Sequence, residues 1–172
     1  SPESLASVMA TVVSLGGKRT SPSLEPLLAL CTDDMGRVDR EIVARMRSPV
    51  ALIPELANHL VGAGGKRMRP LLVYATGDLL GADLVALDAP ASAVELIHAY
   101  SLVHDDLPCM DDDAMRHGKP SVHKAFDEAT AVLASDGLMA FAFEILSDSQ
   151  YFPDPFIRAE LVRCLAVASG PA

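Results

Sequence analysis

The sequence predicts an all-α fold in which helices pack around one or two buried central helices. Apolar residues recur at three- and four-residue spacing over several long stretches, as on one face of a helix. Alternating β-branched or aromatic runs between turn dipeptides, which are typical of strands, are missing. Half of the 172 residues are apolar and 22% are charged, a globular composition with enough chain for one sizeable core.

The chain is expected to have a short N-terminal part and one helical domain. In residues 1–23, a short helix at Ser4–Leu15 precedes a linker at Gly16–Ser23, whose glycines, serines and proline allow mobility. Residues 24–172 form the helical domain.

Six helices are expected in this domain. Pro54 is tolerable in the second only within its first turn. Pro70 can open the third at its first position, where its missing N–H costs nothing. The fourth and fifth are nearly uncharged and suit a buried central position. The expected ranges are 25–47, 50–61, 70–80, 89–107, 128–146 and 155–168.

The overall charge excludes some functions. With 14 basic and 23 acidic residues, the net charge of -9 repels nucleic-acid backbones, so no nucleic-acid partner is expected. An anionic substrate then needs a local basic pocket or metal ions. The three cysteines lack metal-ligand spacing and are read as free thiols in a reducing compartment. No apolar run is expected to span a bilayer, which takes roughly 18 residues. No basic segment precedes Ser4–Leu15 as in a signal peptide, so a cytoplasmic protein is expected.

Five aspartates lie within nine residues, directly after the fourth expected helix. Carboxylate oxygens at this density suit Mg²⁺, which bridges one or two carboxylates to substrate phosphates. Asp105 and Asp111 would diverge by roughly 120° on an ideal helix. A bulge or kink around Pro108, at 107–109, would bring Asp111 back beside Asp105. A solvated acidic loop is the alternative, but the apolar helix before the cluster and the cations after it favour a metal site.

The segment GGKRMRP at 64–70 is the second candidate site. Its glycines let the backbone approach a ligand, and Lys66, Arg67 and Arg69 present cations near a helix N-terminus, as a diphosphate requires. A glycine helix end followed by surface cations is the alternative. His98 precedes Asp105 by seven residues and so lies on nearly the same helix face, where it can donate to a diphosphate.

These motifs, with VELIHAYSLVHDDLPCMDDDAMRHGKPSVHKAF and ATAVLASDGLMAFAFEIL, resemble the trans-isoprenyl diphosphate synthases over about residues 30–170. The strongest similarity is to bacterial farnesyl and plant-type geranylgeranyl diphosphate synthases. The resemblance implies an isoprenoid-synthase-type helical bundle and a Mg²⁺-dependent prenyltransferase. Such an enzyme condenses an allylic diphosphate, dimethylallyl or geranyl, with isopentenyl diphosphate: the allylic C–O bond ionises, isopentenyl diphosphate attacks the carbocation, and a proton is lost.

The resemblance also implies residue roles. Asp105 and Asp111 match metal ligands, with Asp106 supporting them in the catalytic motif. Tyr100 matches the floor of the chain-length cavity, which favours a C15 product, while the small Ser101 beside it leaves C20 open. The residues matching substrate ligands are Gly65, Lys66, Arg69 and His98 for isopentenyl diphosphate, Arg116 for the allylic diphosphate, and His117 in place of a second arginine.

Two departures from the family qualify this expectation. A mostly neutral His117 lacks the guanidinium fork, so isopentenyl diphosphate binding is expected to be weaker. The family's second aspartate-rich motif is absent from the 172 residues, so the bundle is expected to be incomplete at its C-terminus and to expose apolar faces that favour a homodimer. The alternatives are a non-catalytic regulatory subunit or inactive fragment of a prenyl synthase and, more weakly, a terpene cyclase fragment.

Overall fold

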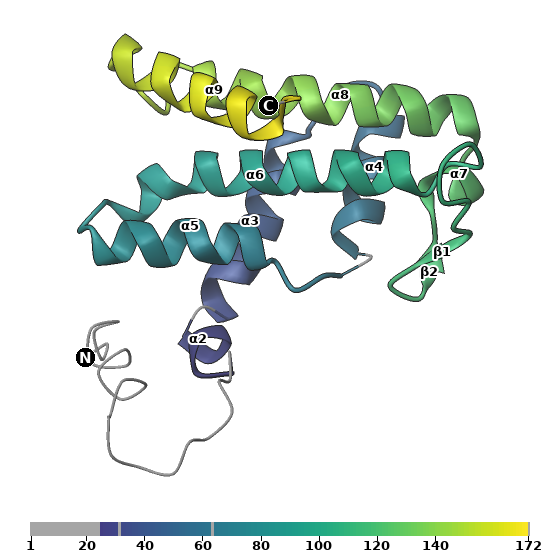
Figure 1. The fold of residues 1–172 in the computed structure, drawn as a ribbon, viewed down its shortest axis with the longest axis horizontal. Coiled ribbons are helices and arrows are strands. Elements are labelled where there is room, and N and C mark those ends of the chain that lie inside the picture. The colour runs from purple at the N-terminus through teal and green to yellow at the C-terminus, as the bar shows by residue number, and fades with distance from the viewer. Residues whose placement is uncertain (1–24, 31, 63, 172) are drawn as a thin grey trace.

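The computed structural model describes residues 25–30, 32–62 and 64–171 (Figure 1). The N-terminal helix and linker expected at 1–23 lie outside the described residues, as does Cys31. The described chain is predominantly helical, which confirms the expected all-α class. Its elements are α2 (Glu25–Leu30), α3 (Thr32–Arg45), α4 (Leu52–Gly62), α5 (Met68–Leu79), α6 (Leu84–Asp105), β1 (Met115–Arg116), β2 (Lys119–Pro120), α7 (Val122–Ala125), α8 (Glu128–Ser147) and α9 (Pro155–Ser169).

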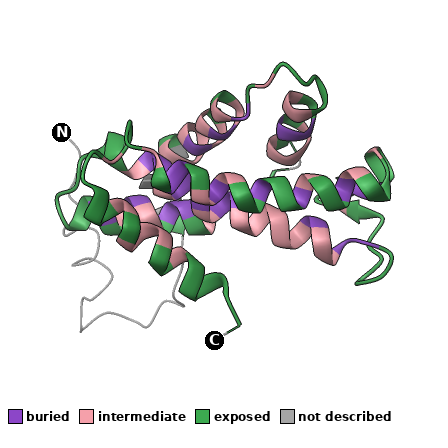
Figure 2. Cartoon of the chain, turned by 90° about the horizontal axis from the view of Figure 1, so that it is seen from above, coloured by how far each residue is buried: buried purple, intermediate pink, exposed green. Residues whose placement is uncertain are grey.

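Helix α6 is the centre of the bundle. Helices α5, α6 and α8 run side by side along the long axis, with α9 beside α8, while α3 and α4 cross behind them (Figures 1 and 2). Buried side chains gather where these helices face one another (Figure 2). The core includes Val38, Ile42, Leu56, Tyr74, Leu96, Val103, Leu138 and Ile145.

Two expected helix boundaries were wrong. The first expected range, 25–47, holds α2 and α3, and Cys31 between them lies outside the described residues. Pro70 is the third residue of α5, not the first, because the helix already begins at Met68. Helix α6 begins five residues before the expected Ala89, because the Asp83 side chain accepts a 3.1 Å hydrogen bond from the N–H of Val85 and caps the helix there. Pro90 is therefore inside α6, where its ring removes one backbone hydrogen bond.

The starts of α8 and α9 agree with expectation, and both have an aspartate cap. The Asp127 carboxylate accepts from the N–H of Thr130 at 2.6 Å, which lowers the pKa of Asp127. The Asp154 carboxylate accepts from the N–H of Phe156 at 2.8 Å, and Pro155 occupies the first turn of α9. Pro54 is the third residue of α4, within the first turn as expected.

Helix α8 corrects the expectation that no segment could span a bilayer by length and composition. It has 20 residues with a mean hydropathy of 1.5 over its most apolar window, and it is the one such helix among the described residues. One third of that window is buried, α8 lies against α6, and it carries Glu128, Asp136 and Glu144. A long helix of a protein core has the same signature, and we interpret α8 as one.

A buried polar cluster joins the helices that carry the site. The Arg37 guanidinium on α3 donates to both carboxylate oxygens of Asp88 on α6, at 2.5 and 2.6 Å. The Tyr74 hydroxyl on α5 donates to the same carboxylate at 2.8 Å, and burial together with this bond raises the pKa of Tyr74. The cluster fixes the α5–α6 hairpin against α3.

Candidate functional site

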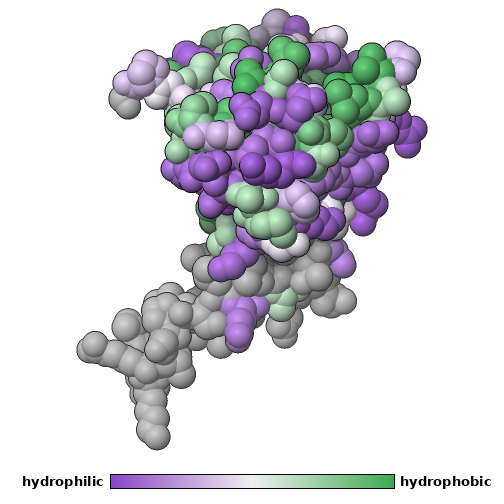
Figure 3. Space-filling model, turned by 90° about the vertical axis from the view of Figure 1, so that its right-hand side faces the viewer, coloured by the Kyte–Doolittle hydropathy of each residue, from purple (hydrophilic) through white to green (hydrophobic). Residues whose placement is uncertain are grey.

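A pocket of about 320 Å³ opens where the loop before α5, the second half of α6 and the β1–β2 hairpin meet. Helix α6 lines it with residues spaced three or four apart, from Glu95 to Asp106, so one helix face forms the wall. Hydrophilic side chains gather on the end of the bundle that carries the hairpin (Figure 3). The lining includes all six expected substrate ligands: Gly65, Lys66, Arg69, His98, Arg116 and His117.

The loop at 64–67 leads into α5 through an unusual backbone. Gly64 and Gly65 have φ angles of 78° and 136°, and Arg67 has a φ of 46°. The chain then enters α5 at Met68, so the positive end of the α5 dipole adjoins the loop, where it favours an anion.

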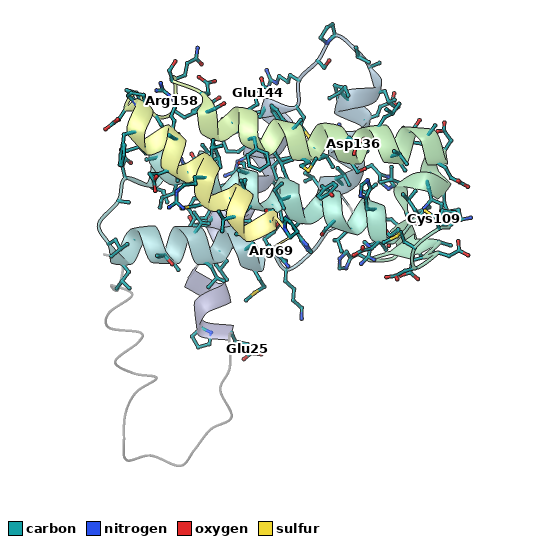
Figure 4. All side chains as sticks on the ribbon, turned by 45° about the horizontal axis from the view of Figure 1, so that its top comes forward. Glu25, Arg69, Cys109, Asp136, Glu144 and Arg158 are labelled. Atoms are coloured by element: carbon teal, nitrogen blue, oxygen red, sulfur yellow. The ribbon has the colours of Figure 1, made fainter. Side chains whose placement is uncertain are left out.

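Lys66 in this loop and Arg69 at the start of α5 are exposed cations, and Figure 4 labels Arg69. Among the described residues, neither forms an ion pair with a carboxylate. Two side chains that line the pocket therefore keep their positive charges for a ligand.

Arg67 does not face the pocket as a free cation, which corrects the expectation for the middle residue of the motif. Its side chain is only 9% exposed, and it pairs with Asp39 at 2.6 Å and Glu95 at 3.0 Å. Glu95, which also lines the pocket, was missed in the sequence. The sequence signal for Glu95 was a single carboxylate within an apolar stretch, three residues before His98.

His98 is half-buried in the pocket wall. Burial lowers its pKa, and the positive charges of Arg69 and Arg116 lower it further. The imidazole is therefore neutral at pH 7 and can donate one N–H to a diphosphate oxygen.

The β1–β2 hairpin brings His117 to the pocket. His117 and Gly118 have φ angles of 49° and 79° and form the two-residue turn between Arg116 and Lys119. Such a turn needs positive φ at both positions, and histidine accepts it more readily than most residues do. The ring of His59 lies 2.9 Å from the carbonyl oxygen of Pro120 and ties the hairpin to α4.

Asp106 holds Arg116 at the pocket. Asp106 is the C-terminal cap of α6 and is 3% exposed, and both of its oxygens accept from the Arg116 guanidinium at 2.5 to 3.0 Å. This pairing raises the pKa of Arg116. The Asp106 carboxylate thus orients Arg116 at the pocket.

Asp105 and Asp111 are brought together by the chain reversal after α6. The helix ends at Asp105, and the N–H of Asp111 donates to the Asp105 carbonyl oxygen at 2.8 Å. The expected bulge inside a helix is instead a helix end followed by a tight turn at Pro108. Within the part of the chain that the structure describes, no group of three or more His, Cys, Asp or Glu side chains could hold a metal. Two carboxylates fit Mg²⁺ when phosphate oxygens supply further ligands.

Tyr100 and Ser101 do not line the basic pocket. The Tyr100 ring packs edge-on against His104, with ring centres 4.7 Å apart. His104 lies 3.9 Å from the Asp136 carboxylate on α8, which Figure 4 labels. Tyr100 is thus on the α8 side of α6, and the Ser101 hydroxyl donates to the His98 carbonyl oxygen at 2.9 Å.

Comparison with known proteins gave consistent matches. The polyprenyl synthetase family profile matches residues 50–168. Farnesyl diphosphate synthase from Haemophilus influenzae is 48% identical over 141 residues, which cover 78% of this chain and 46% of that protein. The apo FPP/GFPP synthase from Zymomonas mobilis aligns with a TM-score of 0.77 and 45% identity, over 86% of this chain and 54% of that one.

A third protein, polyprenyl synthase from Caulobacter crescentus, was solved with calcium and isoprenyl diphosphate. It aligns with a TM-score of 0.70 and 41% identity, over 87% of this chain and 45% of that one. The chain therefore spans about half the length of these relatives. The structural likeness confirms the bundle type expected from the sequence.

Proposed function

Because the chain belongs to the polyprenyl synthetase family, we propose that it carries the isopentenyl diphosphate site and the first metal site of a short-chain prenyltransferase. One observation carries the proposal: a single pocket gathers Lys66, Arg69 and His98, and the two cations have no carboxylate partner among the described residues. The second substrate is an allylic diphosphate, dimethylallyl or geranyl. The expected product is C15, with C20 as the other candidate.

The basic pocket holds the isopentenyl diphosphate. Lys66 and Arg69 donate charge-assisted hydrogen bonds to the diphosphate, and the start of α5 adds its dipole. Neutral His98 donates one N–H without adding charge, and His117 supplies an imidazole where the family resemblance implies a second arginine.

Asp105 and Asp111 are the residues that would hold Mg²⁺ against the allylic diphosphate. A bound Mg²⁺ would supply positive charge that stabilises the diphosphate as a leaving group, which keeps the electron pair of the broken C–O bond. Arg116, held by Asp106, offers its guanidinium to the same diphosphate. The double bond of isopentenyl diphosphate forms the new C–C bond to the allylic cation, and a proton is then lost. The Caulobacter polyprenyl synthase was solved with calcium and isoprenyl diphosphate, which supports a role for a divalent cation in the proposed function.

The assembly and location of the protein also remain predictions. Helices α8 and α9 expose large apolar side chains, with Leu133 at 73% and Phe156 at 71% exposure, which supports association into a homodimer. Light scattering of the purified chain would test the dimer. We keep the cytoplasmic location that the sequence predicts as part of this proposal.

A prenyl-transfer assay tests the proposed function. The chain is incubated with geranyl diphosphate, labelled isopentenyl diphosphate and Mg²⁺, alone and with a complementing C-terminal fragment from a relative. A C15 product is expected, and Asp105→Asn should abolish it. Asp112→Asn is the matched control, because it makes the same charge change in the same turn, and asparagine accepts the positive φ of 55° there. No product above the blank, even with the fragment, would favour a non-catalytic subunit or inactive fragment.

A further inference from the structure

We propose that Arg67 is a positioning residue: clamped between Asp39 and Glu95, it fixes the loop at 64–67 so that Lys66 and Arg69 face the diphosphate together. The inference rests on the proposed function for the identity of the ligand. It separates the three cations of the GGKRMRP motif into two that bind the ligand and one that organises the loop.

The positive φ angle of Arg67 indicates that contacts of its side chain hold the 64–67 loop in place. A φ of 46° is disfavoured for a residue with a long side chain and persists only where the surroundings impose it. The guanidinium makes four contacts: Asp39 at 2.6 Å, Glu95 at 3.0 Å, the Gly64 carbonyl oxygen at 3.1 Å and the Val61 carbonyl oxygen at 3.2 Å. One side chain thus joins α3, α6, the end of α4 and the loop itself.

Gly65 gives independent evidence for this arrangement. A Cβ added at Gly65 would lie 2.9 Å from Nη1 of Arg67, and the φ of 136° already disfavours a side chain. The loop therefore wraps closely around the guanidinium. Glycine is needed at this position to admit Arg67 as well as to leave room for a ligand.

The charges around Arg67 argue against a direct role in binding the diphosphate. Two carboxylates already pair with this one guanidinium, whereas Lys66 and Arg69 are exposed and unpaired among the described residues. Glu95 keeps its second oxygen buried without a partner, and burial raises the pKa of Glu95 in spite of Arg67. The Glu95 carboxylate in the wall of the pocket would repel an anionic ligand. Its ion pair with Arg67 explains why a carboxylate lies there.

Substituting Asp39 distinguishes the positioning role from a purely electrostatic effect, because the two predict opposite changes in diphosphate affinity. Asp39 lies on α3, does not line the pocket and has a side chain 33% exposed, so alanine should be tolerated in the helix. Asp39→Ala removes a negative charge, which by electrostatics alone leaves diphosphate binding unchanged or tighter. The positioning role predicts binding weaker by on the order of 10-fold, the scale of a lost hydrogen bond to a charged group.

Isothermal titration of the full chain with isopentenyl diphosphate, and separately with inorganic diphosphate, measures this effect. Asp39→Asn, which keeps an oxygen acceptor, should restore most of the affinity. Glu41→Ala is the matched control: it also removes a carboxylate paired with an arginine on α3, at 3.1 Å from Arg45, and should bind like the wild type.

Arg67→Lys completes the test, because lysine keeps the charge but not the fork that reaches several acceptors. It should weaken isopentenyl diphosphate binding as much as Arg67→Gln, while Mg²⁺-dependent binding of geranyl diphosphate is kept. Arg67→Lys binding like the wild type, Asp39→Ala binding unchanged or tighter, or equal losses for both ligands would overturn the positioning role. A wild-type chain that binds no diphosphate would instead contradict the proposed function.

Discussion

The backbone N–H of Asp111 donates a 2.8 Å hydrogen bond to the carbonyl oxygen of Asp105. This bond returns the chain to the end of α6. The backbones of two aspartates whose side chains would diverge on a continuous helix therefore lie next to each other. Neither Asp105 nor Asp111 lines the pocket that holds Lys66 and Arg69, so binding at the two places should respond differently to metal removal.

Removing Mg²⁺ with EDTA should abolish binding of geranyl diphosphate and leave binding of isopentenyl diphosphate nearly unchanged. The first ligand depends on the metal held by Asp105 and Asp111, whereas Lys66 and Arg69 bind the second directly. Titration calorimetry with and without EDTA measures both affinities. Equal loss of both ligands would contradict the division of the site.

His98→Asn should reduce the loss of stability at acid pH. In the folded protein the pKa of His98 lies below its ordinary value of 6.5, so below that pH the unfolded chain binds more protons. The contribution of His98 to stability is fully present above pH 6.5 and is lost as the pH falls through the folded-state pKa. Urea unfolding of both proteins from pH 5 to 8 measures this slope, which one group can change by at most about 1.4 kcal/mol per pH unit. Identical slopes would be inconsistent with a neutral, half-buried His98.

Asp88→Ala should destabilise the fold by about 3 kcal/mol, because it leaves Arg37 and the buried Tyr74 hydroxyl without their acceptor. Tyr74→Phe should cost less, about 1 kcal/mol, since one hydrogen bond is lost and Arg37 stays paired. Denaturant unfolding measures both changes. Glu160→Ala, which breaks an exposed pair with Arg163, is the control and should leave the midpoint unchanged.

Tyr100→Ala should lengthen the product of the active protein from C15 towards C20. The ring packs against His104 on the α8 side of α6, and removing it opens space beside the central helix. Chromatography of the dephosphorylated products measures chain length. Ser101→Ala is the control, because it loses only a hydroxyl bonded within its own helix, and an unchanged product with Tyr100→Ala would exclude the ring as a barrier.

Much of the fold was predictable because the determining signals are local. The start of α9 follows from Asp154 and Pro155, and the long apolar stretch of α8 predicts a core helix. The start of α6 was misplaced because the Asp83 cap, which begins the helix at Leu84, was not recognised in the sequence. The hairpin at Met115–Pro120 was missed because two-residue strands are too short to show an alternating pattern.

The sequence predicted which residues lie at the candidate site but not which of them pair with one another. The family resemblance implied the six expected substrate ligands, and all six line the pocket. Sequence spacing gave no sign that Arg67 turns inward, because its partners Asp39 and Glu95 lie 28 residues away on either side. It also gave no sign that Asp106 is occupied by Arg116, which depends on the hairpin.

The central claim is that the pocket between the 64–67 loop, α6 and the hairpin binds isopentenyl diphosphate. Titration of the chain with isopentenyl diphosphate in EDTA tests it most directly, with Lys66→Ala and Arg69→Ala as variants and Arg163→Ala, an exposed arginine of α9, as the control. The account predicts one site per chain, weakened by on the order of 10-fold or more in each pocket variant and unchanged in the control. No binding by the wild type, or equal affinity in all four proteins, would contradict it.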